Sequence, residues 1–218
     1  MANLRLSEGR GAEATRLILE AYSRMRVGCE AMADLVGLGK EATEETENTG
    51  DNGKRRAKEL VEVDAANSLP GYEFRCQTAK LLLECSAVCK GSVGKIDACE
   101  DLSKKSRQGL FCAEAAVQVL GSLLAENDEV VEVWYLLGCA FASFTPTKDD
   151  VSRYYWERAH EMLITVKKSI NKEIAASKAA RDDESMNNQI REIEGQIEEV
   201  EEKLAGLDNK RDQCSSAN

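Results

Sequence analysis

Proline, histidine and aromatic side chains are scarce in this sequence of 218 residues. Two prolines and one histidine occur in the whole chain, and 5% of its residues are aromatic. So few proline turn signals disfavour a strand-rich sandwich, and we expect an all-α protein. The only histidine, His160, begins HEMLI, which lacks the second histidine of a zinc-protease helix. We expect no metal site, no catalytic residue and no cofactor, because no nucleophile, base or metal-binding cluster is recognisable.

Long apolar runs are absent too. The longest stretch without a charged side chain, residues 133–147, has fifteen residues, fewer than the roughly 18 to 20 apolar residues that span a membrane. No basic start followed by an apolar core marks a signal peptide. We therefore expect a protein of the cytoplasm and nucleus without membrane contact, whose eight cysteines stay reduced.

Positive charge is in the minority. Lys and Arg number 29 against 39 Asp and Glu, which gives a formal net charge of −10. Phosphate binding needs clustered Lys and Arg, so we expect no direct contact with nucleic acid. An acidic protein complements a basic one, and we expect a basic protein as the partner.

Periodicity and composition divide the chain into four segments. Residues 1–40 hold an N-terminal helix, a degenerate repeat that ends at Gly37 and Gly39, and residues 41–58 form an acidic and then basic linker. Residues 59–176 carry a helical array, and residues 177–218 an acidic helix and tail. The apolar residues of this last helix follow spacings of 4 and 3, the seam of a short coiled coil: Met186, Ile190, Ile193, Ile197, Val200, Leu204 and Leu207. The seam could pair with a second copy, with a partner, or with the rest of the chain.

The array contains a tetratricopeptide-like motif. Its first half, W-x-x-L-G-x-x-aromatic, is matched by Trp134, Leu137, Gly138 and Phe141, and its second half by Ser152, Trp156 and Ala159. One repeat earlier, the same positions are taken by Leu82, Cys85, Ser86 and Cys89, followed by Ala116 and Leu120. An insertion of about eighteen residues, interpreted as a loop over residues 90–106, separates the helices of this earlier repeat. These spacings predict a tetratricopeptide-like solenoid of helical hairpins with a long C-terminal helix.

A candidate binding surface lies in the same array. When Trp134 occupies its motif position, the residues that face the concave, ligand-binding side include Glu132, Tyr135 and Cys139. Residues 108–147 contain no Lys or Arg, and their acids create a field of one sign: Glu114, Glu126, Asp128, Glu129 and Glu132. Acids are also favoured near the start of a helix, because they interact with its dipole. Both interpretations stay open at this point.

Three stretches of the array resemble a known family. LPGYEFRCQTAKLLLEC, AAVQVLGSLLAENDEVVEVWYLLGCAF and RYYWERAHEML are similar to the tetratricopeptide family of dedicated assembly chaperones for large-subunit ribosomal protein L-four. The resemblance covers residues 69–163 and implies a non-enzymatic chaperone that binds the internal loop of this basic protein and protects it from aggregation. The matching block implies as client contacts Glu126, Asp128, Glu129, Glu132 and Tyr135, with Glu73 and Arg75 on the preceding repeat.

Two other functions compete with this one. An adaptor that clamps a peptide carboxylate needs Lys and Arg on the concave helices, and the first helix of the best repeat, from Val131 onward, has neither. A structural subunit would assemble through the coiled-coil seam and form oligomers. We expect the chaperone to be monomeric without its client, so its sedimentation separates it from such a subunit.

Overall fold

The protein is all-α throughout the part of the chain that its structure describes. The structure, a computed structural model, describes residues 1–38, 69–91, 99–176 and 184–215. These residues contain seven helices and no strand, which confirms the expectation of an all-α protein. The helices fall into two compact units, Met1–Thr147 and Lys148–Asn218. The boundary between the units lies inside the segment 59–176 that the repeat pattern assigns to one array.

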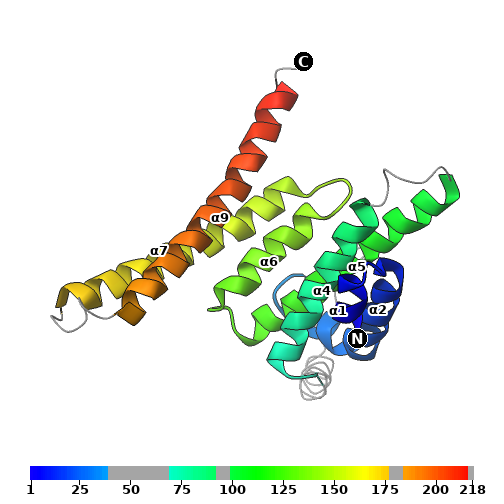
Figure 1. The fold of residues 1–218 in the computed structure, drawn as a ribbon, viewed down its shortest axis with the longest axis horizontal. Coiled ribbons are helices and arrows are strands. Elements are labelled where there is room, and N and C mark those ends of the chain that lie inside the picture. The colour runs from blue at the N-terminus through cyan, green and yellow to red at the C-terminus, as the bar shows by residue number, and fades with distance from the viewer. Residues whose placement is uncertain (39–68, 92–98, 177–183, 216–218) are drawn as a thin grey trace, which may run out of the picture. The chain divides into compact units, whose positions relative to one another are not determined.

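The first unit is built around its longest helix, α5. The unit consists of α1 (Ala2–Ser7), α2 (Gly11–Leu35), α4 (Tyr72–Gly91), α5 (Cys99–Glu126) and α6 (Val131–Ala142). Helix α5 packs against α2, α4 and α6, and α1 packs on α2 (Figure 1). The largest apolar side chains that are fully buried come from α4, α5 and α6: Leu82, Leu120, Leu123, Leu137, Val119 and Val133. Burial of this apolar surface is the main force that holds the unit together.

Helices α2, α4 and α5 approach closely at small residues. The Ser86 hydroxyl of α4 donates a hydrogen bond of 2.8 Å to the Gly109 carbonyl of α5. At Gly121, an added Cβ would lie 2.7 Å from the Cβ of Ala33 on α2, closer than real Cβ atoms come. Any larger residue at position 121 therefore forces α2 and α5 apart.

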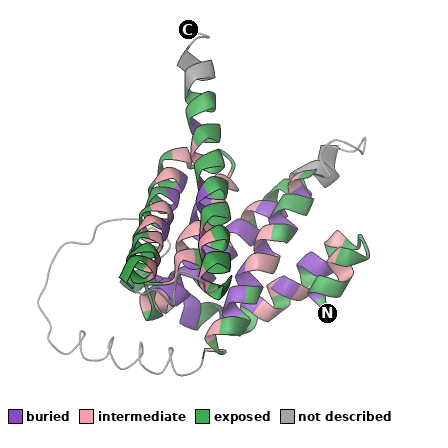
Figure 2. Cartoon of the chain, turned by 60° about the vertical axis from the view of Figure 1, so that its left-hand side comes forward, coloured by how far each residue is buried: buried purple, intermediate pink, exposed green. Residues whose placement is uncertain are grey.

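The second unit is an antiparallel pair of helices, α7 (Asp149–Ala176) and α9 (Glu184–Ser215). Ion pairs join Arg153 to Asp208 and Lys167 to Glu194, and a hydrogen bond of 3.1 Å joins His160 to Glu201. Each step of seven residues forward on α7 is a step of seven backward on α9, so the helices run in opposite directions with a heptad spacing. From the predicted seam, Ile197, Val200 and Leu207 are buried, while most of α9 is exposed (Figure 2). The predicted seam therefore has an intrachain partner, α7.

Several predicted boundaries are wrong. The loop predicted over residues 90–106 is wrong at both ends, because α4 extends to Gly91 and α5 begins at Cys99, while residues 92–98 lie outside the described part of the chain. Residues 99–106 are polar but contain good helix formers, and they extend α5 beyond the apolar pattern from which its start was inferred. The N-terminal segment holds two helices, α1 and α2, instead of one. The predicted stop at Gly37 is confirmed, since Gly37 has a φ of 72°, a conformation that favours glycine.

Some expectations concern residues outside the described part of the chain. The linker 41–58, the first ten residues of the array, 59–68, and Gly39 belong to this group. Within the described part, residues Ser106–Glu126 of α5 are long and apolar enough to cross a membrane by length and composition. Most of this stretch is buried inside the protein, as the central helix of a packed core is.

Candidate functional site

The turn between α5 and α6 carries two of the predicted contact residues, Asp128 and Glu129. Both are exposed, and neither forms an ion pair with any residue that the structure describes. The turn is fixed from within: the Glu129 amide donates to the Asn127 side-chain oxygen at 2.9 Å, and the Trp134 indole donates to the Asp128 carbonyl at 2.7 Å. The turn therefore presents two carboxylates on an ordered backbone.

A buried arginine holds the α5 side of this turn. Only 3% of the Arg75 side chain is exposed. Its Nε donates to the Pro70 carbonyl at 2.9 Å and one terminal nitrogen donates to the Ser122 hydroxyl at 3.0 Å. The other terminal nitrogen pairs with Glu126, the last residue of α5. A buried guanidinium needs such partners, because an unpaired buried charge is strongly unfavourable.

A lysine and a cysteine of α4 hold the α6 side. Lys80 Nζ lies 2.7 Å from Glu132 Oε1, and Cys76 Sγ donates to Glu132 Oε2 at 3.5 Å. The hydrogen bond to Glu132 raises the pKa of Lys80, which keeps its charge. Burial, together with the nearby Glu132 charge, raises the pKa of Cys76 to about 11. The Cys76 thiol is therefore neutral and donates a hydrogen bond at physiological pH.

The structure brings only some of the predicted contact residues together. Glu126 and Glu132 lie at the two ends of the turn and both contact α4. Tyr135 and Cys139 are half-buried on α6, one and two turns beyond Glu132. Glu73 is exposed at the start of α4, where it accepts a hydrogen bond of 3.0 Å from Gln77. Glu73 is thus not part of the cluster around the turn.

Sequence reasoning missed Lys80, Cys76 and Tyr72. All three lie on α4, as does Arg75, which the resemblance suggested. The Tyr72 hydroxyl is buried and has no hydrogen-bond partner within the described structure, and burial raises the pKa of Tyr72, assisted by the charges of Cys76, Glu126 and Glu132. The available signal was repeat spacing: Lys80 and Glu132 are 52 residues apart, as are the motif positions Leu82 and Trp134.

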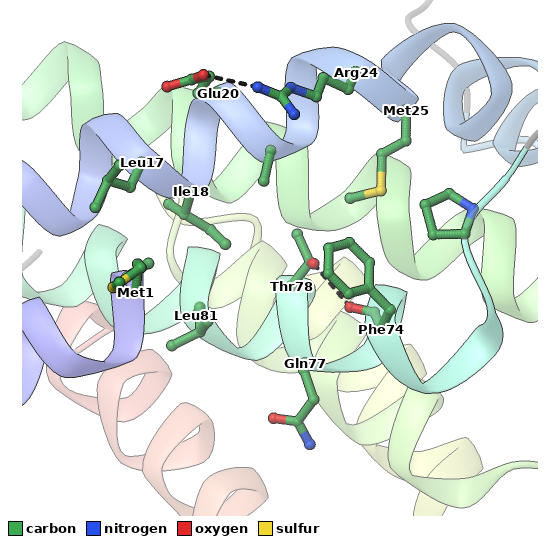
Figure 3. A pocket seen from close by; sticks show the side chains of 13 residues that line it. Met1, Leu17, Ile18, Glu20, Arg24, Met25, Phe74, Gln77, Thr78 and Leu81 are labelled. Carbon is green, nitrogen blue, oxygen red and sulfur yellow. Dashed lines mark hydrogen bonds and ion pairs between the residues drawn. The ribbon is translucent and has the colours of Figure 1, made fainter.

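On its other side, α4 forms an apolar groove with α2. The groove has a volume of about 500 Å³ and is lined mainly by apolar residues of α1, α2 and α4. Met25 and Phe74 lie at one end, and Leu17, Ile18 and Leu81 at the other (Figure 3). Phe74 is 54% exposed, so this groove offers contact area to an apolar side chain.

The carboxylates around the turn do not form a metal-binding group within the described residues. Among the described residues, no group of three or more His, Cys, Asp or Glu side chains is placed to hold a metal ion. What the arrangement can do is bind cations through carboxylates.

Comparison of the chain with models of known protein families, with characterised proteins and with solved structures finds no match.

Proposed function

We propose that this protein is a non-enzymatic chaperone that binds a basic protein segment at the turn between α5 and α6. The observation that carries the proposal is the exposed pair Asp128 and Glu129 on a turn fixed at both ends. Because no cation of the described structure neutralises them, they attract Lys and Arg side chains from outside. Their fixed backbone reduces the entropy lost on binding.

We further propose that α4, α5 and α6 are successive helices of a tetratricopeptide-like array. Lys80 pairs with Glu132, and ten residues later Lys90 donates to the Ser143 carbonyl at the end of α6. Both contacts have nearly the same separation in the chain, which is expected when α4 and α6 are parallel first helices of neighbouring repeats. The repeat pattern predicts buried side chains at four α4 positions, and all four are buried: Leu82, Cys85, Ser86 and Cys89.

The resemblance of residues 69–163 suggests the client, ribosomal protein L-four, through its basic internal loop. An acidic surface suits that role, since it resembles the charge of the RNA on which such a protein later assembles. The competing function, an assembly subunit that associates through its coiled coil, is supported less by the described residues. That function was inferred from the apolar seam of α9, and this seam packs on α7.

The test is a fluorescence titration with the L-four loop peptide and with a scrambled peptide of equal charge, at about 0.15 M salt, where the Debye length is about 8 Å. We expect tight binding of the native loop and weak binding of the scramble. The double substitution Asp128→Asn with Glu129→Gln should weaken binding of the native loop about tenfold. Each removed charge is expected to reduce the binding free energy by about 0.7 kcal/mol.

The matched control is Glu192→Gln with Glu198→Gln, which removes two exposed acids from α9. Equal weakening by both double variants would reduce the effect to net charge and contradict a site at the turn. Circular dichroism checks that each variant is folded. If Asp128 and Glu129 only stabilise the start of α6 through its dipole, their removal changes the unfolding free energy by about 0.3 to 1 kcal/mol and leaves affinity unchanged.

A further inference from the structure

Lys80 lies at the proposed binding surface, on the concave side predicted for Glu132. Its ammonium group contacts one carboxylate oxygen of Glu132 at 2.7 Å, and the Cys76 thiol donates to the other oxygen at 3.5 Å. The chain thus places a lysine ammonium in the acidic surface that is proposed to receive the lysine or arginine side chains of a client. In the free protein, Lys80 thus makes the same ammonium–carboxylate contact with Glu132 that a client lysine would make.

The two carboxylates that flank the turn differ in whether they can change partner. Glu126 neutralises a guanidinium that is 3% exposed, so releasing Glu126 would leave a buried charge without its partner. In the other pair, 33% of the Lys80 side chain and 49% of the Glu132 side chain are exposed. Water can therefore reach and stabilise Lys80 once it leaves Glu132.

We propose that Lys80 is an internal competitor of the client: it holds Glu132 in the free protein and releases it when a client lysine or arginine binds. The inference rests on the proposed function, because it concerns the same surface. Glu132 is then a latent contact, whose availability depends on its partly exposed ion pair with Lys80 and on the hydrogen bond from Cys76. Glu126 keeps Arg75 paired and stays out of the exchange.

The first test is Lys80→Met, which keeps the apolar stem and removes the ammonium. Exposed ion pairs contribute little, so the removed competition should tighten binding of the L-four loop peptide by about threefold to fivefold at about 0.05 M salt. The chain offers a closely matched control in Lys167→Met. Lys167 pairs with Glu194 at 2.8 Å, with 31% and 50% of the two side chains exposed, and the net charge changes equally.

A charge swap distinguishes competition with the client from a purely structural role of the ion pair. In Lys80→Glu with Glu132→Lys, the ion pair can form again with reversed polarity. If the pair only fastens α4 to α6, the swap retains wild-type affinity. If Glu132 is a client contact, the swapped protein folds but binds the loop peptide at least threefold more weakly. In both cases Cys76 loses its acceptor, because a lysine ammonium only donates.

The outcomes distinguish the two proposals. In one outcome, the loop peptide binds the wild type, binding is weaker in the Asp128 and Glu129 variant, and Lys80→Met binds no more tightly than Lys167→Met. This outcome overturns the role of Lys80 and leaves the proposed function standing. Failure of the wild type and of Lys80→Met to bind the loop overturns both. Tighter binding by Lys80→Met alone, with weakened binding by the swap, supports both.

Discussion

The two units of the molecule are held together in different ways. In the first unit, α5 lies among α2, α4 and α6, and large side chains such as Leu120 and Leu123 have no exposed surface. In the second unit, two long helices share one seam, and their flanking ion pairs are partly exposed, as in Arg153 with Asp208, whose side chains are 26% and 61% exposed. The first unit therefore depends on burial, and the second on a narrow seam with charged edges.

The comparison teaches where charge matters. Partly exposed ion pairs link the two helices of the hairpin but contribute little to its stability. In the first unit, Arg75 brings a charge into the interior, where its partners become necessary. Similar ion pairs thus have different consequences, because burial decides how much a lost partner costs. The following variants test this difference, with each unit as the control for the other.

The largest difference is expected from cavities. Leu120→Ala should lower the unfolding free energy of the first unit by about 3 to 4 kcal/mol, because its close-packed surroundings cannot collapse into the space. Leu207→Ala should lower the unfolding free energy of the second unit by about 2 kcal/mol or less, since exposed side chains border the seam.

Urea unfolding followed by tryptophan fluorescence measures each unit separately. The chain has two tryptophans, Trp134 in the first unit and Trp156 in the second, so Trp156→Phe and Trp134→Phe backgrounds isolate the two signals. Equal losses for the two leucine variants would show that the hairpin is packed as tightly as the first unit.

A smaller difference is expected from removing the acid partner of an arginine in each unit. Glu126→Ala leaves the buried Arg75 without its counter-charge, which we expect to cost about 2 kcal/mol, below the 3 to 5 of a fully buried pair because Glu126 is itself half-exposed. Asp208→Ala removes the partner of Arg153 and should cost about 0.5 kcal/mol. Thermal and urea unfolding of both variants give the comparison. A cost for Asp208→Ala as large as that for Glu126→Ala would contradict the role assigned to burial.

As the pH rises, the first unit should begin to lose stability at a lower pH than the second unit. Burial raises the pKa of Cys112 from its usual 9.0 to about 12, and that of Tyr155 in the second unit from 10.0 to about 12. Because the unfolded chain loses these protons first, the stability they contribute is complete below the unfolded pKa and is lost as the pH rises toward the folded pKa. Between pH 8 and pH 10, Cys112 should account for a loss of about 1 kcal/mol.

Urea unfolding at pH 8, 9 and 10 measures this loss, and Cys112→Val should reduce it. The urea midpoint reported by Trp134 should fall from about pH 9, whereas the midpoint reported by Trp156 should stay constant until about pH 10. An unchanged pH profile in Cys112→Val would show that this thiol ionises as easily in the folded protein as in the unfolded chain.

The sequence predicted what depends on local periodicity. Leu82, Cys85, Ser86 and Cys89 follow the spacing of a buried helix face and are buried. The heptad seam that includes Ile197 and Val200 forms a helix whose apolar side packs on α7. Gly37 ends its helix as expected because only its backbone conformation is needed for that prediction.

The sequence could not predict what depends on how helices are rotated against one another. Glu132 was expected on an open surface, and its contact with Lys80 follows from the position of α4 beside α6, which no local pattern contains. The resemblance suggested Arg75 as a client contact, yet Arg75 is buried, and Glu126, Ser122 and Pro70 provide its acceptors from three places in the chain. Such pairs become visible only when the helices are assembled.

The close approach of α2 and α5 at Ala33 and Gly121 limits how this sequence can evolve. A side chain at position 121 would collide with Ala33. A larger residue at either position therefore requires the two helices to separate along their whole contact. Both positions should therefore remain small across homologous sequences, and an alanine at position 121 should occur together with a glycine at position 33. These two sites would then change as a pair, although 88 residues separate them in the chain.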